Sequence, residues 1–345
     1  MSLAYEEVPG GESKGLLKFW LPRLAGISVS VLCVYLAIRR ADLQEFLRAL
    51  RTIDLRWLLA AVLVYLLCFP IRSLRWRRIL LSQKALSVRD VMAPVVLGHM
   101  ANNLLPARAG EVYRAHVLGR RAHLSRSVAV GSIVAERTFD GLMLVGAILF
   151  VFFLYPEAGF LGGAALFTGF VFLALAAGIV FYGFATPGTH RIVNRIVGLL
   201  PRRLQKIVAQ RLMLFLEGLR SVSTTGGYLK TGLYTALIWA LEAAAISLAI
   251  LSFGVVLPVG GYLLVYVMVT LGTTLPSGPG YIGPYQYAFV LALGLFAISR
   301  EEALAISVAA QFALSGSITV IGLVMLWREW LRRADVIAQS RKGAS

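Results

Sequence analysis

Long apolar runs, bounded by charged residues, dominate the hydropathy pattern of the chain. An α-helix needs about 20 apolar residues to cross a bilayer, and six runs come near that length: residues 20–38, 57–71, 138–155, 162–186, 232–253 and 303–327. The second run is short, but the arginines at both of its ends can extend their side chains to the membrane surface. The pattern therefore predicts six membrane-spanning helices.

Two further apolar runs, residues 91–105 and 261–275, stop before they could cross and are followed by segments rich in Pro and Gly. Irregular backbone is tolerated at membrane depth only where it is buried in protein or lines a water-filled cavity. We interpret both runs as parts of re-entrant hairpins, with hinges at Pro106, Gly110, Pro276, Gly278 and Gly280. The predicted fold class is an all-α polytopic membrane protein with about six full transmembrane helices and two broken re-entrant hairpins.

The two halves of the chain are similar to each other. Residues 105–110 (LPARAG) align with 275–280 (LPSGPG), and 132–141 (SIVAERTFDG) align with 307–316 (SVAAQFALSG). Each half would cross the membrane three times, so the second copy must be inverted. Within a single membrane domain, 1–345, we expect a first repeat at 20–155, a second, inverted repeat at 162–327 and a basic cytoplasmic tail at 328–345. Such a pair is typical of transporters that bind their substrate between the broken segments, although a chance match between short Gly- and Pro-rich strings stays open.

Composition places the chain in a membrane. Of the 345 residues, 58% are apolar and 15% are charged, against about 45–50% and 25% in soluble domains. Neither a soluble enzyme nor a nucleic-acid binder is expected. The formal net charge is +17, and the basic stretches 72–89 and 191–220 should be cytoplasmic. We expect a multi-pass protein of a bacterial-type cytoplasmic (inner) membrane, with both termini in the cytoplasm.

One basic segment conflicts with this topology. Residues 39–56 contain five arginines, yet six crossings place them outside. The positive-inside rule counts Lys and Arg rather than net charge, so the conflict stands. We interpret the segment as an amphipathic helix at the outer interface.

Metal and cofactor chemistry have no support in the sequence. Cys33 and Cys68 lie inside apolar runs, and the four histidines lack the spacing of a metal-binding helix. Residues 278–283 fit the G-x-G-x-x-G pattern, but they follow an apolar run rather than a strand of a βαβ unit. We expect no metal, no cofactor and no enzymatic activity.

Three neighbouring ionisable residues, Glu136, Arg137 and Asp140, lie in the helix that ends at residue 155. An ionisable group at membrane depth costs about 2.5 kcal/mol or more, so it faces a cavity or a partner and is a functional candidate. Glu136 and Asp140 are one turn apart on the same helical face, and Arg137 can pair with Asp140. The alternative is an ion pair that only anchors the end of the helix.

Arg108 lies between Pro106 and Gly110 at the tip of the first predicted hairpin. A guanidinium there could donate two parallel hydrogen bonds to a phosphate. The neighbouring polar residues that would extend this site are Asn102, Asn103, Glu111 and Arg114. The residue aligned with Arg108 in the second half is Gly278, so only one hairpin carries the cation. The alternative is that Arg108 balances Glu111 or Glu136.

Glu242 stands near the middle of the run 232–253. A carboxylate there would be protonated or would pair with Arg108 or Arg137. Proton coupling, a countercharge for a cavity and a structural ion pair all stay open. The candidate substrate-binding residues are thus Asn102, Asn103, Arg108, Glu111, Arg114, Glu136, Arg137, Asp140 and Glu242.

The pattern N-N-x-x-P-x-R-x-G-E at residues 102–111, followed by Arg114, by E-R-x-x-D at 136–140 and by the second Pro- and Gly-rich hairpin, resembles a known family. It is the lysylphosphatidylglycerol synthase transmembrane, or flippase-like, family, and the resemblance covers most of the chain. It implies a membrane domain associated with moving modified phospholipids or related lipids between leaflets. Some members carry an aminoacyl-transferase domain as well; because only a short basic tail follows residue 327, we expect the stand-alone flippase-like part.

The prediction is a lipid flippase-like transporter that moves a phospholipid or another anionic or modified lipid between the leaflets of the cytoplasmic membrane. Its partners would be membrane lipids, and the oligomeric state is left open. One alternative is a non-transporting membrane partner of a lipid- or glycan-synthesising enzyme, which would dock on the basic residues 72–78. The other is a proton-coupled small-solute carrier that uses Glu242.

Overall fold

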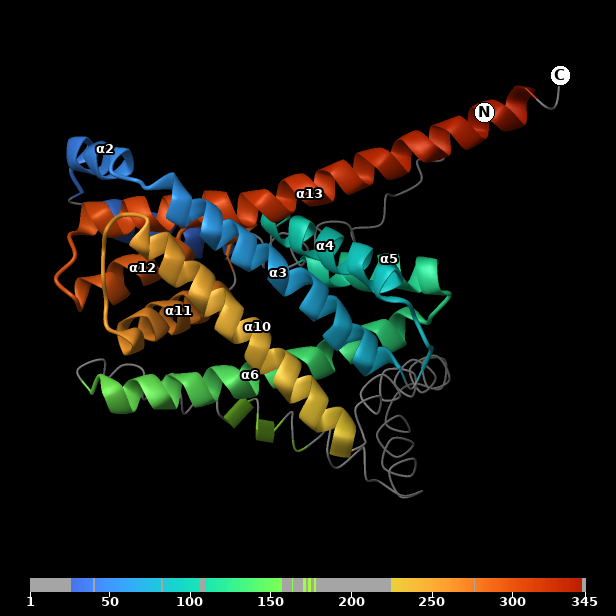
Figure 1. Cartoon of the computed structure of the whole chain (residues 1–345), viewed down its shortest axis with the longest axis horizontal. Coiled ribbons are helices and arrows are strands. Elements are labelled where there is room, and N and C mark those ends of the chain that lie inside the picture. Colours follow the sequence, from blue (N-terminus) through green and yellow to red (C-terminus); the bar gives the residue numbers. More distant parts are fainter. Residues whose placement is uncertain are drawn as a thin grey trace, which may run out of the picture.

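Helices make up the described part of the chain, which contains no strand (Figure 1). The structure, a computed structural model, describes residues 26–39, 41–81, 83–105, 109–156, 163, 170, 171, 173, 174, 177, 225–275 and 277–342; of residues 225, 226 and 332–342 it describes the backbone alone. The elements are a helix at Gly26–Ile38, α2 (Leu43–Arg51), α3 (Leu55–Leu80), α4 (Val88–Leu104), α5 (Ala109–Ala122), α6 (Arg126–Leu154), α10 (Thr225–Leu251), α11 (Val259–Thr274), the 3₁₀ turn η1 (Pro279–Tyr281), α12 (Pro284–Gly294) and α13 (Arg300–Lys342).

Four helices in these residues are long and apolar enough to cross a membrane: α3, α6, α10 and the part of α13 up to Leu331. They coincide with four of the six predicted runs and confirm an all-α polytopic membrane protein. α3 and α10 pack against each other, and α13 runs along the length of the molecule (Figure 1). The predicted run 20–38 is described only from residue 26, and the run 162–186 lies almost wholly outside the described residues.

Three of these helices extend past their predicted ends. α3 continues through Pro70 to Leu80 instead of ending at residue 71, and α6 begins at Arg126 instead of residue 138. α13 continues to Lys342, so most of the predicted tail at 328–345 is helical. The bounds of these two runs were too narrow, because one was ended just before Arg72 and the other was begun just after Arg137. Arg72 pairs with Glu242 and Arg137 pairs with Glu111 inside the protein, so neither charge marks the end of a helix.

Both predicted broken segments are helix-break-helix hairpins. α4 packs against α5, and α11 packs against α12. A Cβ added at Gly110 would lie 2.0 Å from the backbone oxygen of Gly98, so the first hairpin requires glycine at this contact. Gly110 was predicted to be a hinge, but it lies in the first turn of α5, where it allows the two helices to approach closely. The predicted hinges Pro106 and Pro276 lie outside the described residues.

The second hairpin turns at its glycines. Gly280 has φ +66° within η1, and Gly283 has φ +102° just before α12 begins at Pro284. Residues that have a Cβ rarely adopt this left-handed backbone conformation. The backbone N–H of Gly278 donates to Ser30 Oγ at 2.7 Å. The predicted hinges Gly278 and Gly280 thus both lie in the break.

The two hairpins meet at their tips. A Cβ added at Gly280 would lie 3.3 Å from the backbone oxygen of Asn103. α13 passes both tips: Asn103 Nδ2 donates to the Ser315 carbonyl at 3.0 Å, and Gln311 Nε2 donates to the carbonyl of Gly280. This contact brings together segments that the sequence separates widely. The repeat, its inversion and the depth of the hairpins in a membrane stay predictions.

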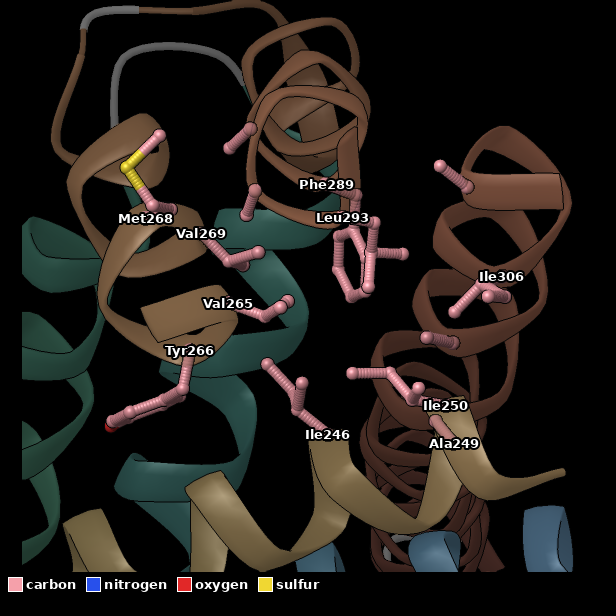
Figure 2. Packing of buried hydrophobic residues seen from close by; sticks show 14 of the residues in the cluster. Ile246, Ala249, Ile250, Val265, Tyr266, Met268, Val269, Phe289, Leu293 and Ile306 are labelled. Atoms are coloured by element: carbon pink, nitrogen blue, oxygen red, sulfur yellow. The ribbon is translucent and has the colours of Figure 1, made fainter. Parts of the chain in front are cut away.

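Two apolar clusters hold these elements in place. The larger one joins α10, α11, α12 and α13, with Ile250, Val265, Phe289 and Ile306 facing one another (Figure 2). The smaller one joins α3, α4, α5 and α6 around the buried Trp76. Each hairpin therefore belongs to its own cluster.

α2 confirms the helix expected within residues 39–56. Asp42 caps it, accepting the backbone N–H of Gln44 at 2.6 Å. Phe46 and Leu50 pack against the larger cluster, while Leu43 and Leu47 are exposed. Its place at an outer membrane interface stays a prediction.

Candidate functional site

A cavity of about 250 Å³ lies between the two hairpins and the crossing helices α3, α6 and α10. Both hairpins contribute to its lining, and so does the middle of α13. Six of the nine predicted substrate-binding residues line it: Asn102, Asn103, Glu111, Arg137, Asp140 and Glu242. The sequence thus predicts much of the lining, although these residues come from four separate helices, α4, α5, α6 and α10.

Arg75 is the centre of the polar network beside the cavity. Its side chain is fully buried, and its guanidinium contacts two helices. Nη2 donates to Glu136 Oε1 at 2.8 Å, while Nη1 donates to Asp140 Oδ1 at 2.5 Å and to Thr235 Oγ1 at 2.9 Å. Glu136 and Asp140 lie one turn apart on α6, as predicted, so a single guanidinium can contact both. Arg75 therefore ties α3 to α6 and α10.

Arg114 lies behind the cavity rather than in its lining. Nη1 donates to Glu136 Oε1 at 3.3 Å, and the guanidinium carbon lies 4.4 Å from the ring centre of Trp76. Within the described residues, Nε and Nη2 of Arg114 have no hydrogen-bond partner. The prediction that Arg114 contacts substrate is not supported by this placement, because its side chain is only 2% exposed and faces Glu136 and Trp76.

Arg137 joins the first hairpin to α6. Its Nε lies 2.9 Å from Glu111 Oε1, and its Nη1 lies 3.2 Å from Asp140 Oδ2. The predicted pairing of Arg137 with Asp140 is therefore confirmed. Arg137 is 30% exposed and Glu111 is 26% exposed, so this part of the network is open to the cavity.

Glu242 pairs with a residue that the sequence did not suggest. Its Oε1 contacts Arg72 Nη2, and its Oε2 accepts the hydroxyl of Tyr266 at 3.0 Å. The sequence predicted that Glu242 would pair with Arg108 or Arg137. Arg137 pairs with Glu111 and Asp140 instead, and Arg108 lies outside the described residues. The Tyr266 ring belongs to the larger apolar cluster, with its hydroxyl pointing away from Phe289 and Ile306 (Figure 2). This tyrosine therefore links the apolar core to the cavity.

Two functional residues were missed. The sequence placed Arg72 and Arg75 in a basic cytoplasmic stretch, but both are buried on α3 and paired with carboxylates of other helices. Arg72 and Arg75 are therefore not part of a free basic surface, whereas Arg77 and Arg78 of the same stretch are partly exposed; docking of an enzyme there stays a prediction. One signal could have found these residues: they are three positions apart, on one helical face, directly after an apolar run.

Charges in this network balance among the described residues. Four guanidinium groups, those of Arg72, Arg75, Arg114 and Arg137, face four carboxylates, those of Glu111, Glu136, Asp140 and Glu242. An unpaired charge would be expensive in a membrane interior, whereas a balanced set can remain there.

An uncharged acceptor also lines the cavity. Asn102 Oδ1 has no hydrogen-bond partner within the described residues, although it is buried. Asn103, its neighbour, uses its amide on α13, where Thr319 Oγ1 accepts a hydrogen bond at 2.9 Å. Asn102 thus lines the cavity with an unpaired but buried acceptor, whereas Asn103 contacts α13 at the junction between hairpin and helix.

The fold and this site define a class: an all-α polytopic membrane protein with a charged internal cavity between two broken helical hairpins. The chain belongs to the family described as the lysylphosphatidylglycerol synthase TM region, whose profile matches residues 23–322. The family resemblance predicted from the sequence is therefore confirmed.

Several relatives support a membrane protein of this family. The chain is 24% identical to a UPF0104 membrane protein of Methanothermobacter thermautotrophicus, over 86% of this chain and 92% of the relative. It is 27% identical to a UPF0104 membrane protein of Methanocaldococcus jannaschii, over 66% of this chain and 92% of the relative. It is also 24% identical to the glycosyltransferase AglD of Haloferax volcanii, over 87% of this chain; the chain spans only 53% of that relative. No solved structure matches the chain.

Proposed function

We propose that the protein is a flippase-like lipid transporter whose central cavity receives the polar headgroup of a phospholipid or another anionic or modified lipid. The observation that carries the proposal is the charged cavity itself, lined by both hairpins and by Asp140, which lies halfway along α6. Ionisable groups at such a depth mark substrate pathways in membrane proteins. The acyl chains would remain in the bilayer. We place the protein in the cytoplasmic membrane, with both termini in the cytoplasm.

Within the cavity we assign the headgroup contacts to exposed parts of the network. Arg137 and Glu111 are the most exposed pair of the network, and Asn102 lines the cavity with them. Arg75 and Arg114 would hold the carboxylates in position from behind. Arg108 stays a sequence prediction; because the network balances without it, its cation would give the site a net positive charge and favour an anionic lipid.

Transport should depend on the cavity residues. In liposomes that contain the purified protein and a fluorescent phosphatidylglycerol, a membrane-impermeant reductant measures how fast lipid moves between leaflets. We expect Asp140→Asn to lower that rate about tenfold or more, because Arg137 loses the carboxylate that positions it for the headgroup, and a hydrogen bond to a charged group is worth about 1.5–3 kcal/mol. Asn102→Ala, which breaks no described hydrogen bond, should lower the rate without lowering stability.

Glu45→Gln is the matched control, because Glu45 is exposed on α2 and does not line the cavity. Its rate should equal that of the unmodified protein. The proposal is wrong if lipid moves between leaflets no faster with the unmodified protein than in liposomes without protein. It is also wrong if both cavity variants keep the full rate.

A second function is favoured by one comparison. The relative AglD is named a glycosyltransferase, and this chain spans about half of it. The alternative is therefore a membrane partner of a glycan-synthesising enzyme, which would bring a lipid-linked substrate to that enzyme rather than move it across the membrane. In that case the cavity variants would lose lipid binding, while the unmodified protein would show no movement between leaflets. That the chain itself is not an enzyme stays a prediction.

A further inference from the structure

A second groove, of about 300 Å³, lies between α5 and the far part of α13. It shares no lining residue with the central cavity. The groove is therefore a separate feature of the molecule.

One face of α5 forms one wall of this groove. The residues that line it, Tyr113, His116, Val117, Arg120 and Arg121, recur at intervals of three and four, which places them on one side of the helix. Arg114 and Leu118, on the other side, are buried against the protein. The polar and aromatic groups of α5 are thus directed into the groove.

The groove has an excess of positive charge. Arg121 Nη2 pairs with Glu329 Oε2 of α13 at 2.6 Å, and both side chains are about one third exposed. Arg120 lines the same groove, is exposed and has no carboxylate partner within the described residues. Two cations therefore face one anion in this groove.

The level of the groove along α13 is that of a membrane surface. Trp327 is 61% exposed and Trp330 is 64% exposed, and Arg328 lies between them. Exposed tryptophans at the end of an apolar helix are typical of the headgroup level of a bilayer. Trp330 lines the groove together with the apolar Leu326, one turn nearer the bilayer. The groove thus combines cationic, aromatic and apolar groups at the depth where a lipid has its headgroup.

We propose that this groove binds the headgroup of an anionic membrane lipid, with its phosphate beside Arg120 and its glycerol region against Trp330. The lipid would lie in the interface, outside the central cavity, and would not need to be the transported lipid. The site does not depend on the proposed transport, and either can fail alone.

Quenching of tryptophan fluorescence tests this site. The protein is reconstituted into vesicles that contain phosphatidylglycerol or phosphatidylcholine with brominated acyl chains, and the contribution of Trp330 is the difference between the unmodified protein and Trp330→Phe. One arginine near an anionic surface contributes about 1 kcal/mol, so the relative binding constant at Trp330 should favour phosphatidylglycerol about fivefold. Arg120→Gln should reduce that preference to about one.

The same helix supplies the controls. Trp327 is equally exposed but does not line the groove, so its contribution, from Trp327→Phe, should show no headgroup preference. Arg328→Gln removes an exposed cation that does not line the groove and should leave the preference at Trp330 intact. The proposal is overturned if Trp330 shows no preference, if Trp327 shows the same one, or if Arg120→Gln leaves it unchanged. All four positions are exposed, so these variants should fold.

Discussion

The first hairpin is tied to the helix that follows it by an ion pair, and the second by hydrogen bonds between amides. In the first half, Arg114 of α5 donates to Glu136 of α6 at 3.3 Å. In the second half, Gln286 of α12 donates to Gln311 of α13. Glu136 and Gln311 are the residues that the repeat alignment matches, and both are buried. The two links have the same place in each half but different chemistry.

The contact between a hairpin and the helix that follows it therefore does not need charge. Two glutamines hold the second hairpin, and a buried ion pair can often be replaced by uncharged residues without loss of stability. The charge in the first half therefore requires another explanation. Its carboxylates also bind Arg75 and Arg137, and Arg137 lines the cavity together with Asp140. The proposed headgroup site in the cavity would explain why the first half carries this charge.

The largest effect should come from breaking the charged link. Arg75→Met leaves Glu136 and Asp140 without their common partner, and removing one member of a buried pair costs about 3–5 kcal/mol. We expect a loss of unfolding free energy in that range when the protein in mixed micelles is titrated with a denaturing detergent. Arg78→Met is the control, since Arg78 lies on the same helix and is only half buried. Equal losses for both variants would contradict the account.

Close backbone contact gives the next effect. A Cβ at Gly110 would lie 2.0 Å from a backbone oxygen of the first hairpin, and one at Gly272 would lie 2.7 Å from the Pro284 oxygen in the second. Overpacking costs about 1–3 kcal/mol, so Gly110→Ala should destabilise more than Gly272→Ala. Gly146→Ala is the control, because nothing lies within 4 Å of a Cβ there; alanine in an open helical position should stabilise by up to about 1 kcal/mol. The same titration gives the change in unfolding free energy for all three variants. A larger loss for Gly272→Ala than for Gly110→Ala would show that the first hairpin is not the more tightly packed one.

The smallest effect should come from the amide link. Gln311→Leu removes the hydrogen bonds to Gln286 and Gly280. Because Gln311 lines the central cavity, water can replace these partners, and the loss should be only about 0.5–1.5 kcal/mol. If this variant loses as much stability as Arg75→Met, the two links are equivalent in energy and the charge needs no functional explanation.

Several features could be predicted from the sequence because their signal is local. Pro and Gly predict the two breaks, and the i to i+3 spacing predicts that Arg137 pairs with Asp140. Isolated carboxylates in apolar helices mark Glu136 and Glu242 as candidates. The family pattern around residues 102–111 then directs attention to the first hairpin.

The rest depends on contacts between helices that are distant in the sequence. Arg72 and Arg75 follow an apolar run, so the positive-inside rule assigns them to a loop; only their partners on α6 and α10 show that the helix continues. Gly110 lies in a Pro- and Gly-rich segment that is typical of a hinge. Only its close approach to the Gly98 backbone oxygen identifies it as a packing contact. Arg114 was expected to contact substrate, but the carboxylate and the indole that surround it are visible only in three dimensions.

Two positions on α13, only two residues apart, show whether a lipid headgroup enters the cavity between the hairpins. Leu314 lines the cavity and is 5% exposed, whereas Phe312 is 75% exposed on the outside of the helix. A photoreactive diazirine analogue of leucine is placed at one position or the other, the protein is irradiated in native membranes, and mass spectrometry locates the bond on any attached lipid. We predict bonds to headgroup atoms from position 314 and to acyl chains from position 312. Acyl chains alone at both positions, or no lipid at position 314, would contradict the account.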